Sequence, residues 1–344
     1  HPLPPDMAWS NKLLAALSQA DRSLARLAEV GNTFPVPHVV ERSFIRKEAV
    51  FSSQIEGTRT TFQELLSFES GQLSLFRDME DAREVQNYVR AIDYGLERLN
   101  TIPLSMRLMR EIHAVLMQGV RGEHMTPGEV RRSQNWISRP GAILEKARYV
   151  PPTPDEIHDC LADLERFIHA DSDLPPLLRI GMIHYQFEAI HPFLDGNGRI
   201  GRLLVTFILV AWDLLTQPLL NLSHFIEINR QEYYDRLLGV SQKGDWEAWL
   251  LFFLEGVHTQ AEDASHRISH LEDLRLTYRE KFLKDRSREA LGMLVDYLIG
   301  SPITSITQAQ ETLKIGSFNM IQRNIEKLEA LAIVREVTAN KRTR

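Results

Sequence analysis

Apolar residues recur at helical spacing along most of this 344-residue chain, and few stretches alternate apolar and polar residues in twos. Val40, Phe44, Phe51 and Ile55, for example, are separated by about one or two helical turns, as on a helix with one buried face. A mainly α fold is therefore predicted, with Gly31 expected to end the first helix. The expected helices cover residues 13–30, 39–55, 80–99, 104–118, 155–170, 176–190, 199–215 and 230–242, with one or two more over 246–284.

One segment departs from the helical pattern. Residues 135–137 (Asn-Trp-Ile) and 148–150 (Arg-Tyr-Val) are short extended runs around the turn-forming residues 139–141 (Arg-Pro-Gly). Two prolines at 151 and 152 then stop the second run. This arrangement predicts a small β-hairpin.

The C-terminal residues have a pattern of their own. Three short helices are expected, around 291–298, over 307–313 and over 317–331, and the strand-like run 332–337 follows them. This order resembles a winged helix-turn-helix. The second strand of the wing should come after Val337, so either the wing is incomplete or the chain has been cut.

The composition is that of an ordinary globular protein. The net charge is −6, so a surface for nucleic acid would have to be local. Cys160 is the single cysteine, which excludes an intrachain disulfide and suits a reducing cytoplasm. The longest apolar run, Leu203–Trp212, is too short to cross a bilayer, and no signal peptide is visible. A cytoplasmic protein without a membrane partner is predicted. The chain starts at His1 without an initiator methionine, so residues are expected to be missing there.

The most informative stretch runs from His191 to Arg202 and reads His-Pro-Phe-Leu-Asp-Gly-Asn-Gly-Arg-Ile-Gly-Arg. A helix should end before Pro192, and Gly196 and Gly198 allow a sharp turn with exposed N–H groups. A long apolar helix then begins. A glycine-rich turn that feeds a helix N-terminus is an anion site, because free N–H groups and the helix dipole both face it.

Four ionisable side chains belong to this loop. Arg199 and Arg202 are three residues apart, so both are expected on the first helical turn beside the anion. Asp195 is the one carboxylate, suited to a Mg²⁺ that bridges phosphates. His191 lies at the mouth, where a neutral imidazole can take a proton from an incoming hydroxyl. Each feature alone is more often structural, but all four converge within one short stretch.

A zinc site is the rival interpretation of the same residues. His184, Glu188 and His191 fall at i, i+4 and i+7 on one helix face, which is similar to metal-ligand spacing. The third residue lies at a helix end, however, and the loop beyond it suits phosphate rather than zinc. A zinc hydrolase is therefore the weaker hypothesis, and His184 is expected to be a core histidine.

The stretch 191–202 resembles the Fic (filamentation induced by cAMP) motif, and it matches at every position. The resemblance implies transfer of AMP from ATP to a Ser, Thr or Tyr hydroxyl of a target protein, with Mg²⁺ as the cofactor. It implies His191 as the base and Asp195 as the metal ligand. It places the α- and β-phosphates on the glycine-rich turn and the γ-phosphate on Arg202. The implied ATP-binding residues are Gly196, Asn197, Gly198, Arg199, Gly201 and Arg202.

The resemblance extends upstream of the motif. Residues 128–131 (Gly-Glu-Val-Arg) and the hairpin from Trp136 to Pro152 look like the family's flap, which clamps the target chain by strand pairing. It implies that Ile143 and Leu144 lie near the tip of this flap and bind the target.

The resemblance also extends downstream. Residues 228–230 (Ile-Asn-Arg), followed by Tyr233 and Tyr234, look like the family's adenosine-side segment. The implied ATP contacts are Asn229 and Tyr233, although two adjacent aromatic residues on a helix more often belong to the core.

The stretch from Ser52 to Gly57 is the second informative motif. A glutamate in the last turn of a helix opposes the helix dipole, so Glu56 is a slightly unfavourable residue that calls for a partner. The segment resembles the family's inhibitory motif, Ser or Thr, three residues, Glu, then Gly or Asn. The resemblance implies that Glu56, supported by Ser52, pairs with Arg202 and so removes the partner of the γ-phosphate.

The predicted organisation has four parts. Residues 1–100 form an N-terminal helical region that carries the inhibitory helix at about 38–57, and residues 101–245 form the Fic catalytic core. Connecting helices cover 246–286, and a winged-helix-like module covers 287–344. The target protein is the expected partner, and a homodimer is left open.

Two alternatives to AMP transfer are kept. One is a related enzyme that moves phosphate or phosphocholine, or removes AMP. The other is a DNA-binding regulator that acts through helix 317–331, although winged helices also bind proteins. The residue types that suggest DNA contact there are Asn319, Gln322, Arg323, Asn324 and Lys327, offset by Glu311, Glu326, Glu329 and Glu336.

Overall fold

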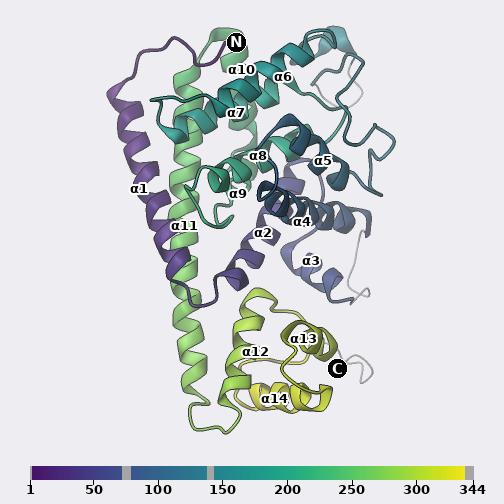
Figure 1. Ribbon diagram of the computed structural model, residues 1–344, viewed down its shortest axis with the longest axis vertical. Coiled ribbons are helices and arrows are strands. Elements are labelled where there is room, and N and C mark those ends of the chain that lie inside the picture. Colours follow the sequence, from purple (N-terminus) through teal and green to yellow (C-terminus); the bar gives the residue numbers. More distant parts are fainter. Residues whose placement is uncertain (1, 72–78, 138–142, 338–344) are drawn as a thin grey trace.

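The computed structural model describes residues 2–71, 79–137 and 143–337, and these residues form a mainly α-helical protein, as predicted (Figure 1). The helices are α1 (Asn11–Thr33), α2 (Pro37–Ile55), α3 (Phe62–Glu69), α4 (Met79–Leu99), α5 (Met106–Leu116), the short 3₁₀ helix η2 (Leu144–Lys146), α6 (Ile157–His169), α7 (Pro176–Ile190), α8 (Asn197–Ala211), α9 (Leu222–Ile228), α10 (Arg230–Lys243), α11 (Trp246–Glu280), α12 (Arg288–Gly300), α13 (Ile306–Leu313) and α14 (Phe318–Ala330).

Most helix boundaries agree with the predicted ones to within a few residues, and α7 agrees at both ends. Residues 246–280 form one continuous helix, while α3 and α9 were not predicted. Gly31 was predicted to end the first helix. It lies inside α1 instead. A Cβ at this position would lie 2.3 Å from Leu219 Cδ1, so Gly31 allows close packing.

The long apolar helix was predicted to end at residue 215, but α8 ends at Ala211. Asp213 is left-handed (φ 55°), and the N–H groups of Leu214 and Leu215 both bond to the Leu209 carbonyl. This local cap closes the helix. In the described part of the chain, no helix is both long enough and apolar enough to span a bilayer.

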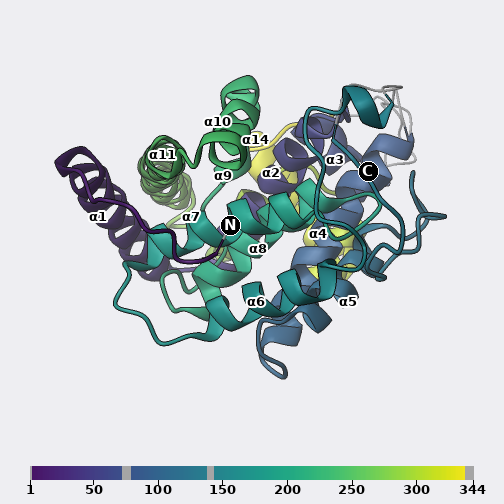
Figure 2. The same ribbon diagram turned by 90° about the horizontal axis from the view of Figure 1, so that it is seen from above.

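The helices α7 and α8 lie at the centre of the upper part of the molecule (Figure 2). On one side α7 contacts α6, α10 and α11, and on the other α8 contacts α2, α4 and α5. The helices α1 and α11 run side by side along one edge, and α11 extends down to the C-terminal helices (Figure 1). The inhibitory helix predicted at 38–57 corresponds to α2, which lies between the upper part and α12.

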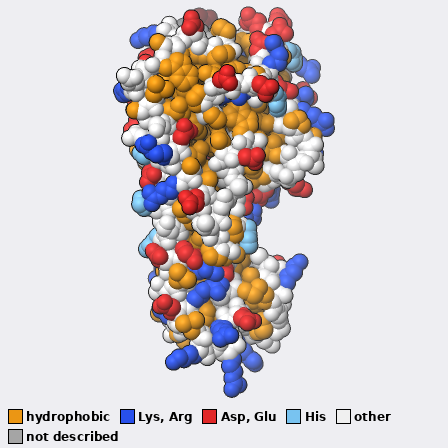
Figure 3. Space-filling view, turned by 60° about the vertical axis from the view of Figure 1, so that its left-hand side comes forward, with side chains coloured by type: hydrophobic (Ala, Val, Ile, Leu, Met, Phe, Trp, Pro, Cys, Tyr) orange, Lys and Arg blue, Asp and Glu red, His pale blue; other side chains and the backbone are white. Residues whose placement is uncertain are grey.

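The C-terminal helices α12, α13 and α14 have a small hydrophobic core of their own, which the end of α11 completes. Its buried members are Phe282, Leu291, Leu294, Val295, Ile306, Ala309, Ile321 and Leu328. Acidic and basic side chains are mixed over the lower part of the face in Figure 3, where this module lies.

The module packs against α2 through a buried arginine. Arg46 Nη1 donates to the Gly300 carbonyl of α12 at 2.6 Å, and Arg46 Nε donates to Glu69 Oε2 at 2.7 Å. Gln308 Nε2 of α13 also donates to the Glu69 carbonyl at 2.8 Å. The module is therefore joined to the same helix that carries Ser52 and ends beside Glu56.

The wing strand predicted over 332–337 is not formed in the described residues. Ala332 is left-handed (φ 55°), and its N–H bonds to the Glu329 carbonyl. The next N–H, of Ile333, bonds to the Leu328 carbonyl. These bonds cap α14, and Ile333 and Val334 pack onto the small core instead of pairing as a strand.

The predicted hairpin is reduced, in the described residues, to one antiparallel pairing. Ile137 N donates to the Tyr149 carbonyl at 2.9 Å, and Arg148 N and Tyr149 N donate to the Ile137 carbonyl at 2.9 and 3.1 Å. The turn at 139–141 lies outside the described residues. We call residues 136–152 the flap from here on.

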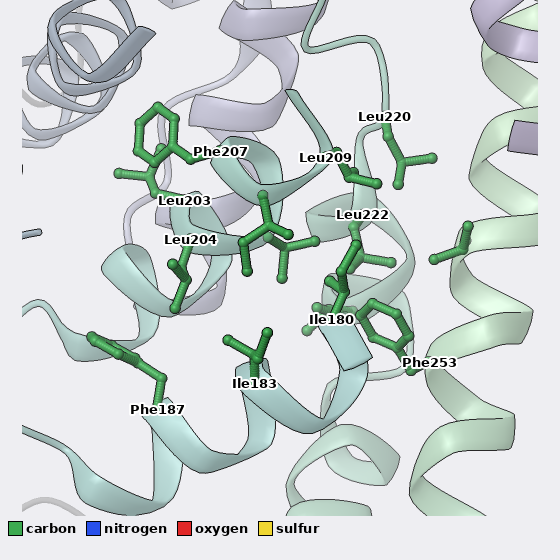
Figure 4. Packing of buried hydrophobic residues seen from close by; sticks show 14 of the residues in the cluster. Ile180, Ile183, Phe187, Leu203, Leu204, Phe207, Leu209, Leu220, Leu222 and Phe253 are labelled. Atoms are coloured by element: carbon green, nitrogen blue, oxygen red, sulfur yellow. The ribbon is translucent and has the colours of Figure 1, made fainter. Parts of the chain in front are cut away.

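The pair α7–α8 supplies much of the main core. Ile183 and Phe187 of α7 lie near Leu203, Leu204 and Phe207 of α8, and all five side chains are buried (Figure 4). Burying one such side chain contributes about 1.5–3 kcal/mol. The loop that joins these two helices is therefore attached at both ends to the main hydrophobic core.

Candidate active site

The loop between α7 and α8 begins at His191, whose backbone is left-handed (φ 51°, ψ 61°). Such a conformation is costly for a non-glycine residue and persists where its surroundings hold it. The His191 carbonyl accepts hydrogen bonds from Arg131 Nε at 3.0 Å and from Asn135 Nδ2 at 3.3 Å. Arg131 N also donates to the Pro192 carbonyl at 2.9 Å. The residues that lead into the flap thus fix the mouth of the loop.

The His191 imidazole is oriented by its own helix. Its Nδ1 lies 3.3 Å from the Glu188 carbonyl oxygen, which can only accept, so Nδ1 carries the proton and Nε2 keeps its lone pair. Burial lowers the pKa of His191 to about 4. The ring is therefore neutral near pH 7 and has one nitrogen ready to accept a proton.

The glycine-rich turn brings the α8 N-terminus close to the cleft. Gly196 is left-handed (φ 77°) and precedes the first residue of α8. The Asn197 side chain bonds both to Phe193 N and to the Phe193 carbonyl, each at 2.8 Å, so it holds the turn together. A Cβ at Gly198 would lie 2.3 Å from Glu56 Oε1, so a side chain there would push the Glu56 carboxylate aside. The first N–H groups of α8 remain available for an anion.

Asp195 is the carboxylate of this loop. Its side chain is 43% exposed, and its Oδ1 accepts from Gly196 N at 2.6 Å. No group of three or more His, Cys, Asp or Glu side chains that could hold a metal ion occurs in the described residues. A cation at Asp195 would therefore take most of its ligands from the phosphates and from water.

Only one of the two loop arginines faces the cleft. Arg199 is buried against α4 and α5, with Nη1 3.3 Å from Glu84 Oε2 and Nη2 3.6 Å from Met117 Sδ. Glu84 is itself buried, and a buried carboxylate is stable only with such a partner. Arg199 Nη2 also lies 3.8 Å from Asp195 Oδ1. Of the two arginines, Arg202 lines the cleft, while Arg199 fastens the start of α8.

Arg202 is held by the end of α2. Its Nε donates to Ser52 Oγ at 2.8 Å, and its Nη2 donates to the Ser52 carbonyl at 2.9 Å and to Glu56 Oε1 at 2.7 Å. The Arg202 side chain is 2% exposed and the Glu56 side chain 31% exposed. The structure therefore brings together the three residues of the predicted inhibitory contact.

The electrostatics of this contact favour the charged forms. Burial by itself would raise the pKa of Glu56, but the charge and hydrogen bonds of Arg202 outweigh it and the pKa falls below its usual value. Burial would lower the pKa of Arg202, yet Glu56 and its other neighbours raise it. Both groups are ionised near pH 7, so the contact is a charge-assisted pair.

A cleft of about 970 Å³ opens beside His191 and Arg202. Its walls come from α7, α8, α10, the flap and the end of α2, and they include Tyr185, Glu188, Gly198, Tyr233, Tyr234, Ile137, Tyr149 and Glu56. The lining includes the aromatic residues Trp136, Tyr149, Tyr185, Tyr233 and Tyr234 and the charged residues Glu56, Lys146, Arg148, Glu188, Arg202 and Arg230. The cleft therefore offers both aromatic surface and charged groups.

Glu188 is an unusual group in this wall. It is buried, its Oε1 has no hydrogen-bond partner, and burial raises its pKa to about 7. A Cβ at Gly201 would lie 2.2 Å from this oxygen, so Gly201 makes room for the carboxyl group rather than contacting the cleft directly.

Of the two predicted adenosine-side residues, Tyr233 lines the cleft and Asn229 does not. The Tyr233 hydroxyl bonds to His184 Nε2 at 2.8 Å, and its buried ring is one wall of the cleft. Asn229 Nδ2 donates to the Phe225 carbonyl at 2.9 Å, so this amide is used within the helix junction α9–α10. His184 is buried and bonds also to the Gly201 carbonyl at 3.0 Å, so it is a core histidine, as predicted.

The two predicted flap residues lie at the edge of the described segment. Ile143 is 57% exposed, and Leu144 begins η2. Arg148 of the flap forms an ion pair with Asp235 of α10, so the flap is tied to the helix across the cleft.

Glu48 is a buried residue of this region that the motifs did not indicate. Its carboxylate accepts hydrogen bonds from Ser223 N at 3.3 Å and from the Ser223 hydroxyl, and burial raises its pKa to about 7. Glu48, Ser52 and Glu56 are spaced by four residues on α2, which is a polar stripe on a mostly buried helix. This spacing is the feature of the sequence that could have pointed to Glu48. Arg131, by contrast, bonds to backbone carbonyls that only the folded chain brings together.

Comparison with known proteins gives matches to two family models. The model described as Fic/DOC family N-terminal matches residues 14–97, and the model described as Fic/DOC family matches residues 103–209. Together they cover α1 to α8, which includes the α2 end, the glycine-rich turn and Arg202.

Among curated proteins, the protein adenylyltransferase Fic of Drosophila erecta is 26% identical over 179 residues, which are 48% of this chain and 33% of that protein. The protein of the same name from Drosophila virilis is 25% identical over 206 residues, 55% of this chain and 39% of that protein. The matched part is thus about a third of the length of these relatives.

Among solved structures, a Fic family protein from Desulfovibrio desulfuricans is similar with a TM-score of 0.65 and 19% identity, covering 95% of this chain and 91% of that chain. Fic-1 from C. elegans is similar with a TM-score of 0.53 and 20% identity, covering 76% and 74%. At these identities the likeness concerns the fold.

Proposed function

The chain belongs to the Fic/DOC family, and on this basis we propose that it is a protein adenylyltransferase that transfers AMP from ATP to a hydroxyl of a target protein. The observation that carries the proposal is the meeting, in one cleft, of a neutral His191 with a free Nε2, the α8 N-terminus and Arg202. A base, an anion site and a fixed cation are what nucleotidyl transfer to a hydroxyl requires.

The proposed reaction has one base and one leaving group. The target hydroxyl gives its proton to His191 Nε2 while its oxygen forms a bond to the α-phosphorus of ATP. The bond from that phosphorus to the bridging oxygen breaks, and pyrophosphate leaves. The left-handed backbone of His191, held by Arg131, keeps the ring at the mouth of the cleft, and positioning of this kind supplies much of the rate.

The phosphates are assigned to the α8 N-terminus and to Arg202. Asn197 and Gly198 would present backbone N–H groups to the α- and β-phosphates, and Arg202 would hold the γ-phosphate. Gly196 would shape the turn, because its own N–H is engaged by Asp195 Oδ1. Arg199 supports this site indirectly, because its guanidinium is engaged by Glu84.

A Mg²⁺ ion fits the donor chemistry of the loop. Asp195 offers a hard, partly exposed carboxylate oxygen, and Mg²⁺ is commonly held by one or two carboxylates plus substrate phosphates. When bound, the ion would offset the negative charge of the phosphates.

The aromatic wall that α10 contributes to the cleft is assigned to the adenosine. Tyr233 would contribute its ring, because its hydroxyl is engaged by His184, and Asn229 would act by shaping the start of α10. Ile143 and Leu144 are assigned to the target chain, since the flap borders the cleft opposite α10.

We further propose that the wild-type chain is autoinhibited by Glu56 with Ser52. Arg202 makes three hydrogen bonds to these two residues, so the γ-phosphate and the end of α2 compete for one guanidinium. ATP that cannot use Arg202 would place its α-phosphorus off the line of attack.

A DNA-binding role finds little support in the C-terminal module. Of the residues that suggested it, Asn324 is only 3% exposed, and Lys327 Nζ is bonded to Asp285 Oδ1 at 2.8 Å. The mixed charges of the face in Figure 3 do not form a single basic surface.

The test is a labelling experiment with Glu56→Gly. The variant would be incubated with a cell extract and with ATP labelled either at the α- or at the γ-phosphate. We expect label in protein from α-labelled ATP only, and a mass increase of one adenylate on a Ser, Thr or Tyr. Label from γ-labelled ATP would instead indicate phosphate transfer.

A further inference from the structure

His113 is a buried histidine outside the recognised motifs, and it bonds directly to the glycine-rich loop. It lies on α5 and is 1% exposed. Its Nδ1 accepts a hydrogen bond from Gly128 N at 2.8 Å, and its Nε2 lies 3.0 Å from the Asp195 carbonyl oxygen. Its ring is stacked on Phe193, with centroids 3.9 Å apart and planes at 5°.

The two partners fix the tautomer of this ring. A backbone N–H can only donate, so Nδ1 has no proton and accepts from Gly128. A carbonyl can only accept, so Nε2 carries the proton and donates to Asp195. The ring therefore joins one donor and one acceptor, and neither bond can form with the other tautomer.

The ring also lies between two segments that meet at the cleft. Gly128 begins the 128–131 segment, which ends at Arg131 and leads into the flap. Arg131 bonds to the carbonyls of His191 and Pro192, at the start of the glycine-rich loop. His113 bonds to the carbonyl of Asp195, at the end of the same loop. The 128–131 segment thus connects to both ends of the loop, directly through Arg131 and indirectly through His113.

We propose that His113 is a positioning residue for the transfer reaction, which holds residues 193–196 and the base of the flap in one fixed relation. This inference rests on the proposed function. By holding the Asp195 carbonyl, His113 sets the backbone from which both the Asp195 carboxylate and the turn at Gly196 project. The loop must keep its shape before ATP binds, because misplacing a phosphate by about 1 Å can cost about 100-fold in rate.

Two amide substitutions separate the two bonds of the ring. In His113→Gln, the amide reaches the place of Nε2, so it can donate to the Asp195 carbonyl but no longer accepts from Gly128. In His113→Asn, the amide ends at the place of Nδ1, so it keeps the bond to Gly128 and loses the bond to Asp195. Both remove the ring and its stacking on Phe193, and they differ by one methylene group, so their melting temperatures are compared as well.

Each substitution would be made together with Glu56→Gly, where transfer can be measured. We expect His113→Gln to keep kcat/KM for ATP within a few-fold and His113→Asn to lose about 10- to 100-fold, at similar melting temperatures. His169→Asn serves as a control, because this exposed ring also bonds to a backbone carbonyl, of Leu104, but far from the loop. It should leave kcat/KM unchanged.

Hydrogen exchange of the nucleotide-free proteins gives a readout that needs no turnover. Amides of residues 193–198 should exchange at least several-fold faster in His113→Asn than in His113→Gln, while amides of α7 exchange alike in both. Equal exchange in the loop, or equal kcat/KM for the two variants, would overturn the inference and leave His113 as a core side chain. If the Glu56→Gly parent transfers no AMP, the proposed function fails, and the exchange comparison still decides the role of His113.

Discussion

Arg202 Nη2 donates a hydrogen bond to Glu56 Oε1 at 2.7 Å, although 146 residues separate the two in the chain. The same nitrogen also bonds to the Ser52 carbonyl, and Nε bonds to the Ser52 hydroxyl. The guanidinium is therefore saturated on the side that faces α2. A ligand that needs Arg202 Nε or Nη2 has to displace part of this charge-assisted network.

The first prediction concerns the release of Arg202. Glu56→Gly removes the carboxylate, so self-labelling from α-labelled ATP should rise by about 10- to 100-fold over wild type. Glu56→Asp should fall between the two, because its shorter side chain reaches Arg202 less well. Initial rates of label incorporation measure both effects.

Arg202→Ala provides the matched control for this prediction. It should be inactive both alone and together with Glu56→Gly, since the group that Glu56 releases is then missing. A folded Glu56→Gly protein that labels itself and extract proteins no faster than wild type would contradict the inhibitory role.

The second prediction concerns the base. With Glu56→Gly as the parent, His191→Ala should lose about 10²–10⁴-fold in transfer rate, because no other group is assigned to take the hydroxyl proton. ATP binding, measured by calorimetry, should stay within a few-fold of the parent. Full transfer activity in this variant would remove His191 from the mechanism.

The third prediction concerns the divalent ion. Asp195→Ala should raise the Mg²⁺ concentration needed for half-maximal transfer by about tenfold or more, and chelation by EDTA should stop the parent reaction. The control is Glu227→Ala, a half-buried carboxylate on α9 outside the loop, which should leave the Mg²⁺ dependence unchanged. Turnover that continues in EDTA would exclude the magnesium role.

The fourth prediction is a pH dependence of stability. Burial raises the pKa of Glu48 from 4.5 to about 7. Between these values the folded chain binds a proton that the unfolded chain does not, so Glu48 makes the wild type less stable as pH rises from about 5 to 8. The amide in Glu48→Gln stays neutral. The free energy of unfolding of the variant should therefore rise by roughly 3 kcal/mol relative to that of wild type over this pH interval.

Melting temperatures of Glu48→Gln and wild type at pH 5.5 and pH 8 test this. The melting temperature of the variant, relative to that of wild type, should be higher at pH 8 than at pH 5.5. A difference that is the same at both values would show that the Glu48 carboxyl does not titrate in the folded state as expected.

The fifth prediction concerns the contact between α2 and the C-terminal module. Arg46→Met leaves the Gly300 carbonyl and Glu69 without their donor, so it should destabilise the protein by about 1–3 kcal/mol. Arg42 lies on the same helix as Arg46 and forms an exposed ion pair with Asp93 of α4. Arg42→Met should therefore destabilise the protein by no more than about 1 kcal/mol. Equal melting temperatures for the two variants would contradict a structural role for Arg46.

The parts of the fold that the sequence predicted well are those set by local pattern. The ends of α7 and the turn at Gly196 follow from apolar spacing and from proline and glycine, and these signals lie within a few residues of what they determine. The strand predicted over 332–337 is not formed in the described residues, for a related reason. Its apolar residues suit a strand, but a left-handed Ala332 caps α14 and turns Ile333 onto the small core.

The features that the sequence did not predict depend on contacts between distant segments. Arg199 faces Glu84 on α4, 115 residues away, and no local signal says that it turns away from the cleft. The local sequence predicts a helix end at Gly31, but this glycine instead allows Leu219 to pack closely against α1. The bond of His113 to Asp195 spans 82 residues. In each case the partner is defined only by the packing of segments that lie far apart in the chain.

The end of α2 and Arg202 belong to one folded chain, and this sets how their contact responds to its surroundings. An intramolecular contact has a constant effective concentration, so dilution of the protein does not loosen it and abundance does not tighten it. Its occupancy can change only through a molecule that binds one arrangement of α2 better than the other. The strength of the contact between Glu56 and Arg202 is therefore set within the chain itself.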